Sequence, residues 1–300
     1  MEHSKSLLGV LCGTLPAGIN LTAVEELDAD TPFGQASASP VKGKLPNGQT
    51  IVMLNRHGQG HVKSPSSINY PANIWALKRF GVTHVLSLSA CGSLSEKIVP
   101  GKTLVIPDQL FDWTKGIRPH TFFPGNNDLV AHISLADPIC TNFSARVFQS
   151  CNKLFNAEKK LFPLHLGGTY VVIEGPNFST RAESEFFKST LKASVVGMTA
   201  LPEAKLAREI GLCYAILCLP ADYDSWHRGR PGVTADEVAA GLKHFTEIPE
   251  LLVAELSKSL ENHWSQCSCR DSLKGFAIHS DLHLISDDTR DKYKLFAGIK

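Results

Sequence analysis

Short apolar runs alternate with amphipathic stretches along most of this chain, and that alternation restricts the possible fold more than any other feature. Strands are predicted at 7–11, 50–54, 82–89, 103–107, 168–173, 195–198 and 213–219. Helices are predicted at 70–80, capped by Asn69 and ended by Gly81, at 202–210, and at 234–259. Strands that alternate with helices in this way are typical of an α/β protein.

A chain of 300 residues is long enough for one large domain or two small ones. No internal repeat occurs and the Pro- and Gly-rich stretches are short, so nothing marks a linker. Lys plus Arg number 30 and Asp plus Glu 29, so the formal net charge is only +1. Such a charge produces no overall electrostatic field that would attract nucleic acid or an anionic membrane surface. The apolar stretch at 7–12 is too short for a membrane span. We expect a single-domain protein of the cytoplasm, or of both the cytoplasm and the nucleus, with no nucleic-acid or membrane partner.

The eight cysteines are scattered along the chain, and several lie in apolar runs. Buried, reduced thiols of a cytosolic protein fit this distribution. The close pair Cys267-Ser268-Cys269 has no second Cys or His pair at the spacing of zinc ligands. We therefore predict surface thiols at this pair and no metal site.

Six of the apolar strands are followed by loops that carry small, hydroxyl-bearing or charged residues. These loops contain Cys12-Gly13-Thr14, Asn55-Arg56-His57-Gly58, Ser89-Ala90-Cys91-Gly92-Ser93, Glu174-Gly175-Pro176-Asn177-Phe178-Ser179, Met198-Thr199 and Asp222-Tyr223-Asp224. In an open α/β sheet, ligands bind at the carboxyl ends of the strands. One such loop is usually only a turn, but six in register predict a common site.

The donors at these strand ends suit a tetrahedral oxyanion such as phosphate. They are a guanidinium that can bind in bidentate fashion, an imidazole, three hydroxyls and a backbone N–H, from Arg56, His57, Thr14, Ser89, Thr199 and Ala90. An equally supported interpretation of the first pair makes Arg56 a surface ion-pair partner and His57 a structural histidine. Neither G-x-x-x-x-G-K-[ST] nor a strand-linked G-x-G-x-x-G occurs, which argues against nucleoside triphosphates and dinucleotides.

Asp222 follows a strand of nearly continuous hydrophobicity, which places its carboxyl at the rim of the core. A carboxylate there is costly to bury, so it binds a metal, caps a helix or has a shifted pKa. No second acidic pair lies at a comparable strand end, which disfavours the metal. The helix cap and the shifted pKa both remain open at this point.

Seven segments carry a more specific signal: RHGQGH at 56–61, NYPANIWAL at 69–77, SACGSL at 89–94, IEGP at 173–176, FS at 178–179, RAE at 181–183 and ADYD at 221–224. They resemble the trimeric purine nucleoside phosphorylases, and the resemblance covers about residues 8–256. It implies a single α/β domain whose mixed sheet is partly closed into a barrel and flanked by helices. It also implies a phosphorylase domain at 1–262, a weakly matched C-terminal extension at 263–300, and a homotrimer with active sites near subunit boundaries.

The reaction implied by the resemblance is the displacement of adenine from 5′-methylthioadenosine by phosphate, which leaves 5-methylthioribose 1-phosphate. The implied phosphate site is the donor set described above. The implied nucleoside site consists of Phe178, Ser179, Met198, Asp222, Asp224, Val233 and Val238, together with His132 lent by the neighbouring subunit. Asp222, Ser89 and Thr199 would be the catalytic residues, and phosphate would be a co-substrate with no metal or organic cofactor.

Asp222 would then share a proton with purine N7 while phosphate attacks C1′, a general-acid role typically worth about 10² to 10⁴ in rate. Two alternatives remain open. One is a phosphorylase for adenosine or for 6-oxopurine nucleosides, although the Asp222 carboxyl favours a 6-amino base. The other is a nucleoside-binding paralogue without turnover, suggested by Leu15-Pro16 where relatives carry glycine. Asn177 in place of Arg and Ser89 in place of Thr are further departures.

Overall fold

The computed structural model describes residues 6–13, 19–125, 128–158, 162–260, 267–275 and 277–296. Its framework is an 11-stranded mixed sheet. Along the main path the order is β10 (Leu164–Leu166), β8 (Leu104–Ile106), β13 (Cys213–Asp222), β7 (His84–Ser93), β1 (Leu8–Cys12), β6 (Thr50–Asn55), β5 (Val41–Lys44) and β2 (Thr22–Glu26). The four central strands β13, β7, β1 and β6 are parallel, so their carboxyl ends lie at the same edge.

The sheet branches at the carboxyl end of β7. There β7 pairs with the antiparallel strand β12 (Val195–Gly197), which continues to β11 (Thr169–Ile173) and β9 (Gln109–Trp113). A separate hairpin joins β3 (Asp30–Thr31) and β4 (Gly34–Gln35). Because the sheet branches here, the ends of strands from both branches surround the region next to the carboxyl end of β7.

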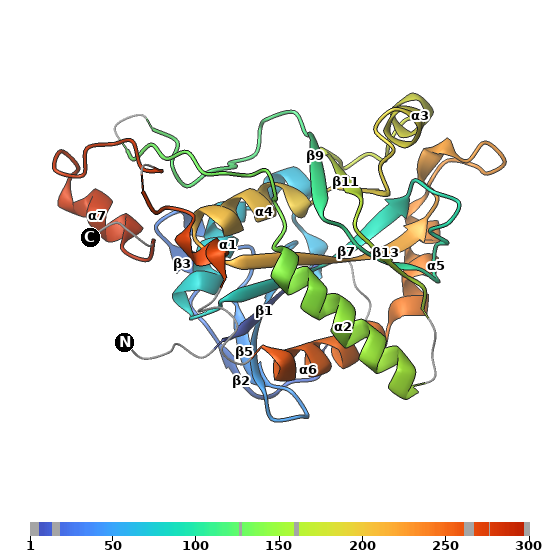
Figure 1. Cartoon of the computed structure of the whole chain (residues 1–300), viewed down its shortest axis with the longest axis horizontal. Coiled ribbons are helices and arrows are strands. Elements are labelled where there is room, and N and C mark those ends of the chain that lie inside the picture. The colour runs from blue at the N-terminus through green and yellow to red at the C-terminus, as the bar shows by residue number, and fades with distance from the viewer. Residues whose placement is uncertain are drawn as a thin grey trace.

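Helices lie on both faces of the central strands (Figure 1). On one face are α1 (Tyr70–Arg79) and α4 (Ala200–Glu209); on the other are α2 (Thr141–Glu158) and α6 (Ile248–Ser259). The remaining helices are α3 (Arg181–Ser189), α5 (Ala235–Leu242) and α7 (Asp287–Tyr293). Figure 1 places α3 and α5 at one end of the long axis and α7 at the other. This arrangement confirms the predicted α/β domain with a mixed sheet flanked by helices.

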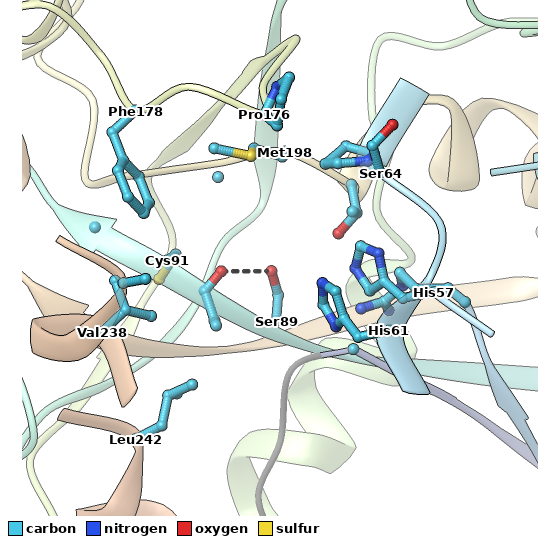
Figure 2. Close-up of a pocket in the computed structure, with 18 of the residues that line it drawn as sticks. His57, His61, Ser64, Ser89, Cys91, Pro176, Phe178, Met198, Val238 and Leu242 are labelled. Carbon is cyan, nitrogen blue, oxygen red and sulfur yellow. Dashed lines mark hydrogen bonds between the residues drawn. The ribbon is translucent and has the colours of Figure 1, made fainter. Parts of the chain in front are cut away.

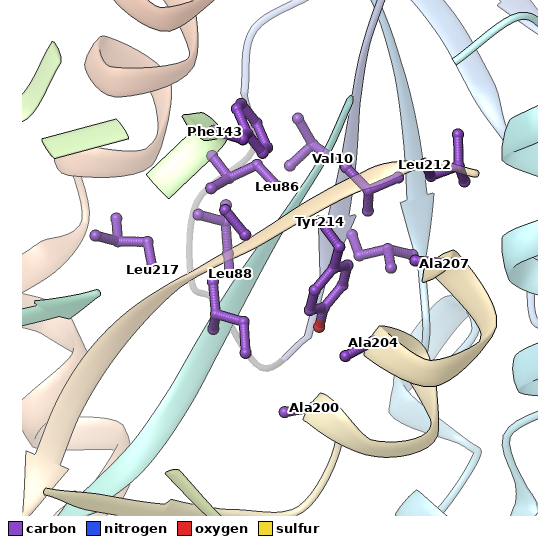
Figure 3. Packing of buried hydrophobic residues seen from close by; sticks show 14 of the residues in the cluster. Val10, Leu86, Leu88, Phe143, Ala200, Ala204, Ala207, Leu212, Tyr214 and Leu217 are labelled. Carbon is purple, nitrogen blue, oxygen red and sulfur yellow. The ribbon is translucent and has the colours of Figure 1, made fainter. Parts of the chain in front are cut away.

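The core is continuous across the central strands (Figure 3). On the α4 side, Ala200, Ala204 and Ala207 turn their small side chains toward Tyr214 of β13. Residues three and four apart share a helix face, so these alanines let α4 approach the sheet closely. The opposite side is filled by larger residues such as Leu86 and Phe143.

Three predicted boundaries are wrong. The strand expected to end at residue 89 continues to Ser93, so the polar segment 89–93 belongs to the strand and not to a loop after it. The strand expected to end at residue 219 likewise continues to Asp222. The helix expected over 234–259 is divided into α5, a 3₁₀ turn at Lys243–Phe245 and α6. Pro249 lies at the start of α6 and has no backbone N–H, so an uninterrupted helix cannot run through it without losing a hydrogen bond.

The described part of the C-terminal segment packs into the same core as the rest of the chain. Tyr293 and Phe296 are buried against the loop that contains Phe122 and Phe123, and the Tyr293 hydroxyl donates to the Phe122 carbonyl at 2.6 Å. Cys267 and Cys269 are buried as well, so the expectation of surface thiols there is wrong. No helix among the described residues is long and apolar enough to cross a membrane.

Candidate active site

The polar segments at the carboxyl ends of β1, β6, β7, β11, β12 and β13 meet around one cavity of about 840 Å³ (Figure 2). Of the residues predicted for the site, those that line it are Arg56, His57, Ser89, Ala90, Phe178, Met198, Thr199, Asp222, Asp224 and Val238. This volume lies within the range of small-molecule sites, roughly 300 to 1,000 Å³. The convergence expected from the strand ends is therefore present.

Arg56 is fully buried, and hydrogen bonds to neighbouring protein groups hold its guanidinium in place. Its Nε donates to Oε1 of Glu203 at 2.7 Å. Both N–H groups of Nη2 are used, on the carbonyl of Leu11 at 3.1 Å and the hydroxyl of Ser87 at 2.7 Å, while Nη1 donates to the Leu88 carbonyl at 3.0 Å. Because a guanidinium carries five N–H groups, only one, on Nη1, is left without a partner among the described residues.

These hydrogen bonds correct both interpretations of Arg56, as a surface ion-pair partner and as a bidentate ligand for an oxyanion. It is not a surface ion-pair partner, because it is 1% exposed. It cannot bind an anion in bidentate fashion either, because only one N–H is left for a ligand. Burial acts to lower the pKa of Arg56, but the Glu203 carboxylate outweighs it and the pKa is raised. The guanidinium therefore stays charged at the cavity wall.

His57 is oriented by its backbone neighbour. Its Nδ1 lies 2.8 Å from the carbonyl of Lys63, and because a carbonyl only accepts, Nδ1 carries the proton. Burial lowers the pKa of His57 to about 4, although the Lys63 bond opposes this shift. Its ring stacks on His61 with centroids 4.1 Å apart. The imidazole is thus neutral, with Nε2 as a hydrogen-bond acceptor.

Two hydroxyls complete the polar end of the cavity. Ser89 is buried on β7, where its Oγ donates to the carbonyl of Ala90 at 3.3 Å (Figure 2). The same Oγ lies 3.0 Å from the Tyr170 hydroxyl. Thr199 occupies the N-cap position of α4, yet its side chain makes no capping hydrogen bond. Gly13 closes this end: a Cβ there would lie 2.8 Å from Nη1 of Arg56, so a side chain would compete with a ligand for that nitrogen.

Two carboxyls lie at the carboxyl end of β13, next to Gly92 of β7. Asp222 is 5% exposed, and its Oδ1 accepts the backbone N–H of Asp224 at 2.7 Å. Burial raises the pKa of Asp222 to about 7, with the nearby charge of Asp224 adding to the shift. Burial also raises the pKa of Asp224. A Cβ on Gly92 would lie 2.9 Å from Oδ1 of Asp222, so glycine is needed there for the two acids to fit.

Apolar side chains form the remaining walls. Figure 2 shows Phe178, Pro176 and Met198 on one side of the cavity and Val238 and Leu242 of α5 on the other. The helix lies against the end of β13 because Gly241 has no side chain: a Cβ would be 2.2 Å from the Ala221 carbonyl oxygen. The cavity is therefore polar near Arg56 and apolar near α5.

The structure does not bring every predicted residue to this cavity. Thr14 and Leu15-Pro16 lie outside the described residues. Ser179 is buried, and its carbonyl accepts the Ser225 hydroxyl at 2.7 Å, so it supports the turn that carries Asp224. Val233 is absent from the cavity lining, and His132 is exposed beside His279. The roles expected of these residues stay predictions.

Two important residues were missed by sequence reasoning. Glu203 holds Arg56 and also accepts the hydroxyls of Ser87 and Tyr214 with Oε2, at 3.0 and 2.7 Å. Arg118 pairs with Glu174 at 3.0 Å and donates to the carbonyl of Met198 at 2.6 Å, which ties two cavity loops together. The only signal for the first is a glutamate on the core-facing side of the helix predicted at 202–210.

Comparisons with known proteins agree with this geometry. A sequence profile of the phosphorylase superfamily matches residues 8–257. The S-methyl-5′-thioadenosine phosphorylase of Geobacter sulfurreducens is 39% identical over 295 residues, which cover 98% of this chain and 99% of that protein. The corresponding protein of Hyperthermus butylicus is 43% identical over 256 residues, covering 85% of this chain and 89% of that protein.

Solved structures give the same result. A methylthioadenosine phosphorylase from an Antarctic soil metagenomic library has a TM-score of 0.86 and 35% identity, covering 97% of this chain and 99% of that one. A mutant adenosine/methylthioadenosine phosphorylase of Schistosoma mansoni, in complex with methylthioadenosine, has a TM-score of 0.74 and 33% identity, covering 85% and 91%.

Proposed function

Because this chain belongs to the phosphorylase superfamily and matches its S-methyl-5′-thioadenosine phosphorylases over nearly the full length, we infer that it catalyses phosphorolysis of 5′-methylthioadenosine. The products are adenine and 5-methylthioribose 1-phosphate, and the reaction belongs to purine and methionine salvage. The observation that carries this inference is a single cavity with a buried, proton-holding carboxyl at one wall and a clamped guanidinium with two hydroxyls at another.

We propose that phosphate binds at the polar end of the cavity. One oxygen accepts the remaining Nη1 N–H of Arg56, and others accept from the hydroxyls of Ser89 and Thr199 and from the N–H of Ala90. His57, neutral with Nε2 as an acceptor, takes a hydrogen bond from a protonated phosphate oxygen. Such fixed donors, prepared before the reaction, hold the nucleophile below C1′.

We propose that Asp222 is the general acid. During the reaction the C1′–N9 bond breaks with both electrons leaving on the base, and a phosphate oxygen forms the new bond to C1′. The Asp222 proton passes to N7, so adenine leaves as a neutral molecule. A pKa raised to about 7 by burial is suited to this step, because the acid is then half protonated near neutral pH.

The apolar walls suggest how the nucleoside lies. Phe178 stacks on the base, Met198 contacts the ribose, and Asp224 accepts from the exocyclic amine directly or through water. At the 5′ end, Val238 and Leu242 give an apolar surface that suits a methylthio group better than a hydroxyl. Adenosine is the second candidate substrate, because relatives in Schistosoma mansoni are named adenosine/methylthioadenosine phosphorylases.

We also propose a homotrimer in the cytoplasm, or in both the cytoplasm and the nucleus, with His132 of each chain completing a neighbour's 5′ pocket. The exposed position of His132, away from its own chain's cavity, supports this arrangement. Residues 1–262 would be the phosphorylase domain and 263–300 an extension of it. Sedimentation at assay concentration tests the assembly, and a fully active monomer would exclude a role for His132 in a neighbour's site.

The test of the reaction is adenine release from methylthioadenosine with and without inorganic phosphate. We expect turnover to require phosphate and to yield one sugar phosphate per adenine. Equal rates without phosphate would identify a hydrolase instead, and binding of the nucleoside with no turnover in either buffer would identify a paralogue that has lost activity. Running adenosine and inosine in parallel measures kcat/KM for the competing substrates.

A further inference from the structure

A second cluster of reactive side chains lies outside the active site. Cys140, Cys213, Cys267 and Cys269 are all buried, and their four sulfur atoms lie within 4.8 Å of one another. They come from three separate segments: the residue before α2, the first residue of β13 and the short turn at Ser268–Asp271. From this geometry we propose that the four thiols bind one zinc ion as a structural tetrathiolate site.

The sulfur spacing fits a metal better than a covalent crosslink. A tetrahedral zinc with bonds of about 2.3 Å holds its sulfurs about 3.8 Å apart. The Cys140 and Cys267 sulfurs are 3.6 Å apart, whereas a disulfide requires about 2.05 Å. Four sulfurs within 4.8 Å of one another can close around a metal ion with small side-chain rotations.

The ligand set is selective. Four soft thiolates in a tetrahedral arrangement favour zinc over calcium, magnesium or manganese, which prefer oxygen ligands. Each thiol that binds as a thiolate releases its proton to solvent, so zinc uptake is accompanied by acidification. With all four positions filled by protein, no position is open for a substrate, which is typical of a structural site.

The surroundings also suit bound thiolates. The backbone N–H of Phe143 donates to the Cys140 sulfur at 3.4 Å, and the Asn142 side chain lies 4.0 Å from the Cys267 sulfur. Groups around the ligands that donate to sulfur are a common part of metal sites.

The site has a clear structural consequence. Cys213 begins β13 and Asp222 ends it, so the two sites are separated by nine residues of strand, about 30 Å at ~3.3 Å per residue. Zinc would fasten the C-terminal segment at Cys267 and Cys269 to the amino-terminal edge of the central sheet. Its role would be stability, with the active site left unchanged.

The first measurement is zinc content of the full-length protein, purified under reducing conditions and passed through gel filtration. We expect about one zinc per chain. Replacement by cobalt should give the strong visible bands and the sulfur-to-cobalt charge-transfer absorption of a tetrahedral thiolate site. Failure of the reduced protein to hold zinc or to bind added cobalt would overturn the proposal.

Variants assign the ligands. Cys267→Ser and Cys269→Ser should each weaken cobalt binding by at least about 10-fold, the lower limit seen even for outer-shell changes. Cys151→Ser is the matched control, because Cys151 is buried in α2 outside the cluster, and it should bind cobalt normally. If all three variants bind cobalt as tightly as the unchanged protein does, Cys267 and Cys269 are not metal ligands and the proposed site is excluded.

A thiol titration separates zinc from disulfides. After denaturation with a chelator and without reductant, a zinc protein exposes all eight cysteines. A protein with two disulfides in the cluster exposes four fewer, and that result would replace the zinc site with covalent crosslinks. The count does not depend on activity or on the folding of any variant.

Discussion

The two ends of β13 carry buried polar groups in opposite arrangements. At the carboxyl end, Asp222 and Arg56 are supported from behind by protein partners, and each keeps a group directed to a cavity of about 840 Å³. At the amino end, Cys213 and three other thiols contact one another, and all four are buried. The first end is arranged for a ligand that enters and leaves, and the second for a permanent closed contact.

The difference shows how one strand serves two purposes. A ligand site needs groups whose interactions are incomplete until the ligand binds, and such groups must be held by the structure around them. A structural site needs every group satisfied within the protein. Removing the supporting groups at the carboxyl end of β13 should therefore affect both ligand chemistry and folding. Removing a thiol at the amino end should affect folding alone.

The largest effect is expected for Glu203→Ala. This change leaves Arg56 charged and buried without its carboxylate, which typically costs about 3–5 kcal/mol of stability. Chemical denaturation measures the loss, and the KM for phosphate should rise because the guanidinium is no longer held. Glu255→Ala is the control, since its partners Lys153 and Lys258 are both exposed and each pair should contribute about 1 kcal/mol or less. Equal losses in the two variants would contradict this account.

Next in size is Asp222→Asn. The amide keeps the shape but cannot transfer a proton, so kcat for methylthioadenosine should fall at least about 10²-fold, while preference moves toward 6-oxopurine nucleosides. Thermal stability should change little. If Asp222 served only to cap the following turn, the result would be reversed, with about 1 kcal/mol of stability lost and turnover almost normal.

The pH dependence sharpens the same assignment. Because burial raises the pKa of Asp222 to about 7 in the ligand-free protein, we expect kcat/KM for methylthioadenosine to be constant below that pH and to fall about tenfold per unit above it. The native state holds this proton more tightly than the unfolded chain, so the contribution to stability falls as pH rises from about 4 to about 7. A kcat/KM that stays level up to pH 9 would remove Asp222 as the proton donor.

A smaller effect is expected for Phe178→Ala. Loss of an aromatic stacked on a base typically costs about 1–3 kcal/mol. Because Phe178 is 40% exposed at the cavity edge, we expect the lower value, a rise of about fivefold in the KM for methylthioadenosine. Phe186→Ala is a matched control, since that ring is similarly exposed but lies on α3 outside the cavity lining. A similar KM change in both variants would exclude stacking by Phe178.

The smallest effect on catalysis is expected at the thiol end. Cys267→Ser should leave kcat for methylthioadenosine within about twofold of the unchanged protein at 25 °C, since its cluster partner Cys213 lies at the opposite end of β13 from Asp222, about 30 Å along the strand. Its thermal midpoint should nevertheless fall. A large loss of kcat in a folded sample would show that the two ends of β13 are coupled.

The sequence predicted the ligand end of the strands well because its signals are local. Arg56, Ser89, Thr199 and Asp222 each lie at or just after an apolar run, and parallel strands bring such positions together. Partners distant in sequence were not predictable. Glu203 is 147 residues from Arg56, and Cys267 is 127 residues from Cys140, so no spacing rule relates them.

The prediction of one continuous helix over 234–259 failed for a different reason. Val238, Leu242, Leu252 and Leu256 keep helical spacing across the region where the chain is interrupted. Periodicity records which side faces the core, and it does not detect a short break between two helices that share that side. Pro249 was the local signal for the break, because proline favours the first turn of a helix.

That break has an evolutionary consequence. In α5 only Leu242 is buried, while Ala235, Val238 and Ala239 face the cavity from a helix that α6 does not continue. Selection can therefore replace these residues one at a time without disturbing the packing of α6 against α2. A lineage whose supply of nucleosides changes has, in this short helix, a place to adapt its substrate preference while Asp222 and the polar end of the cavity are inherited intact.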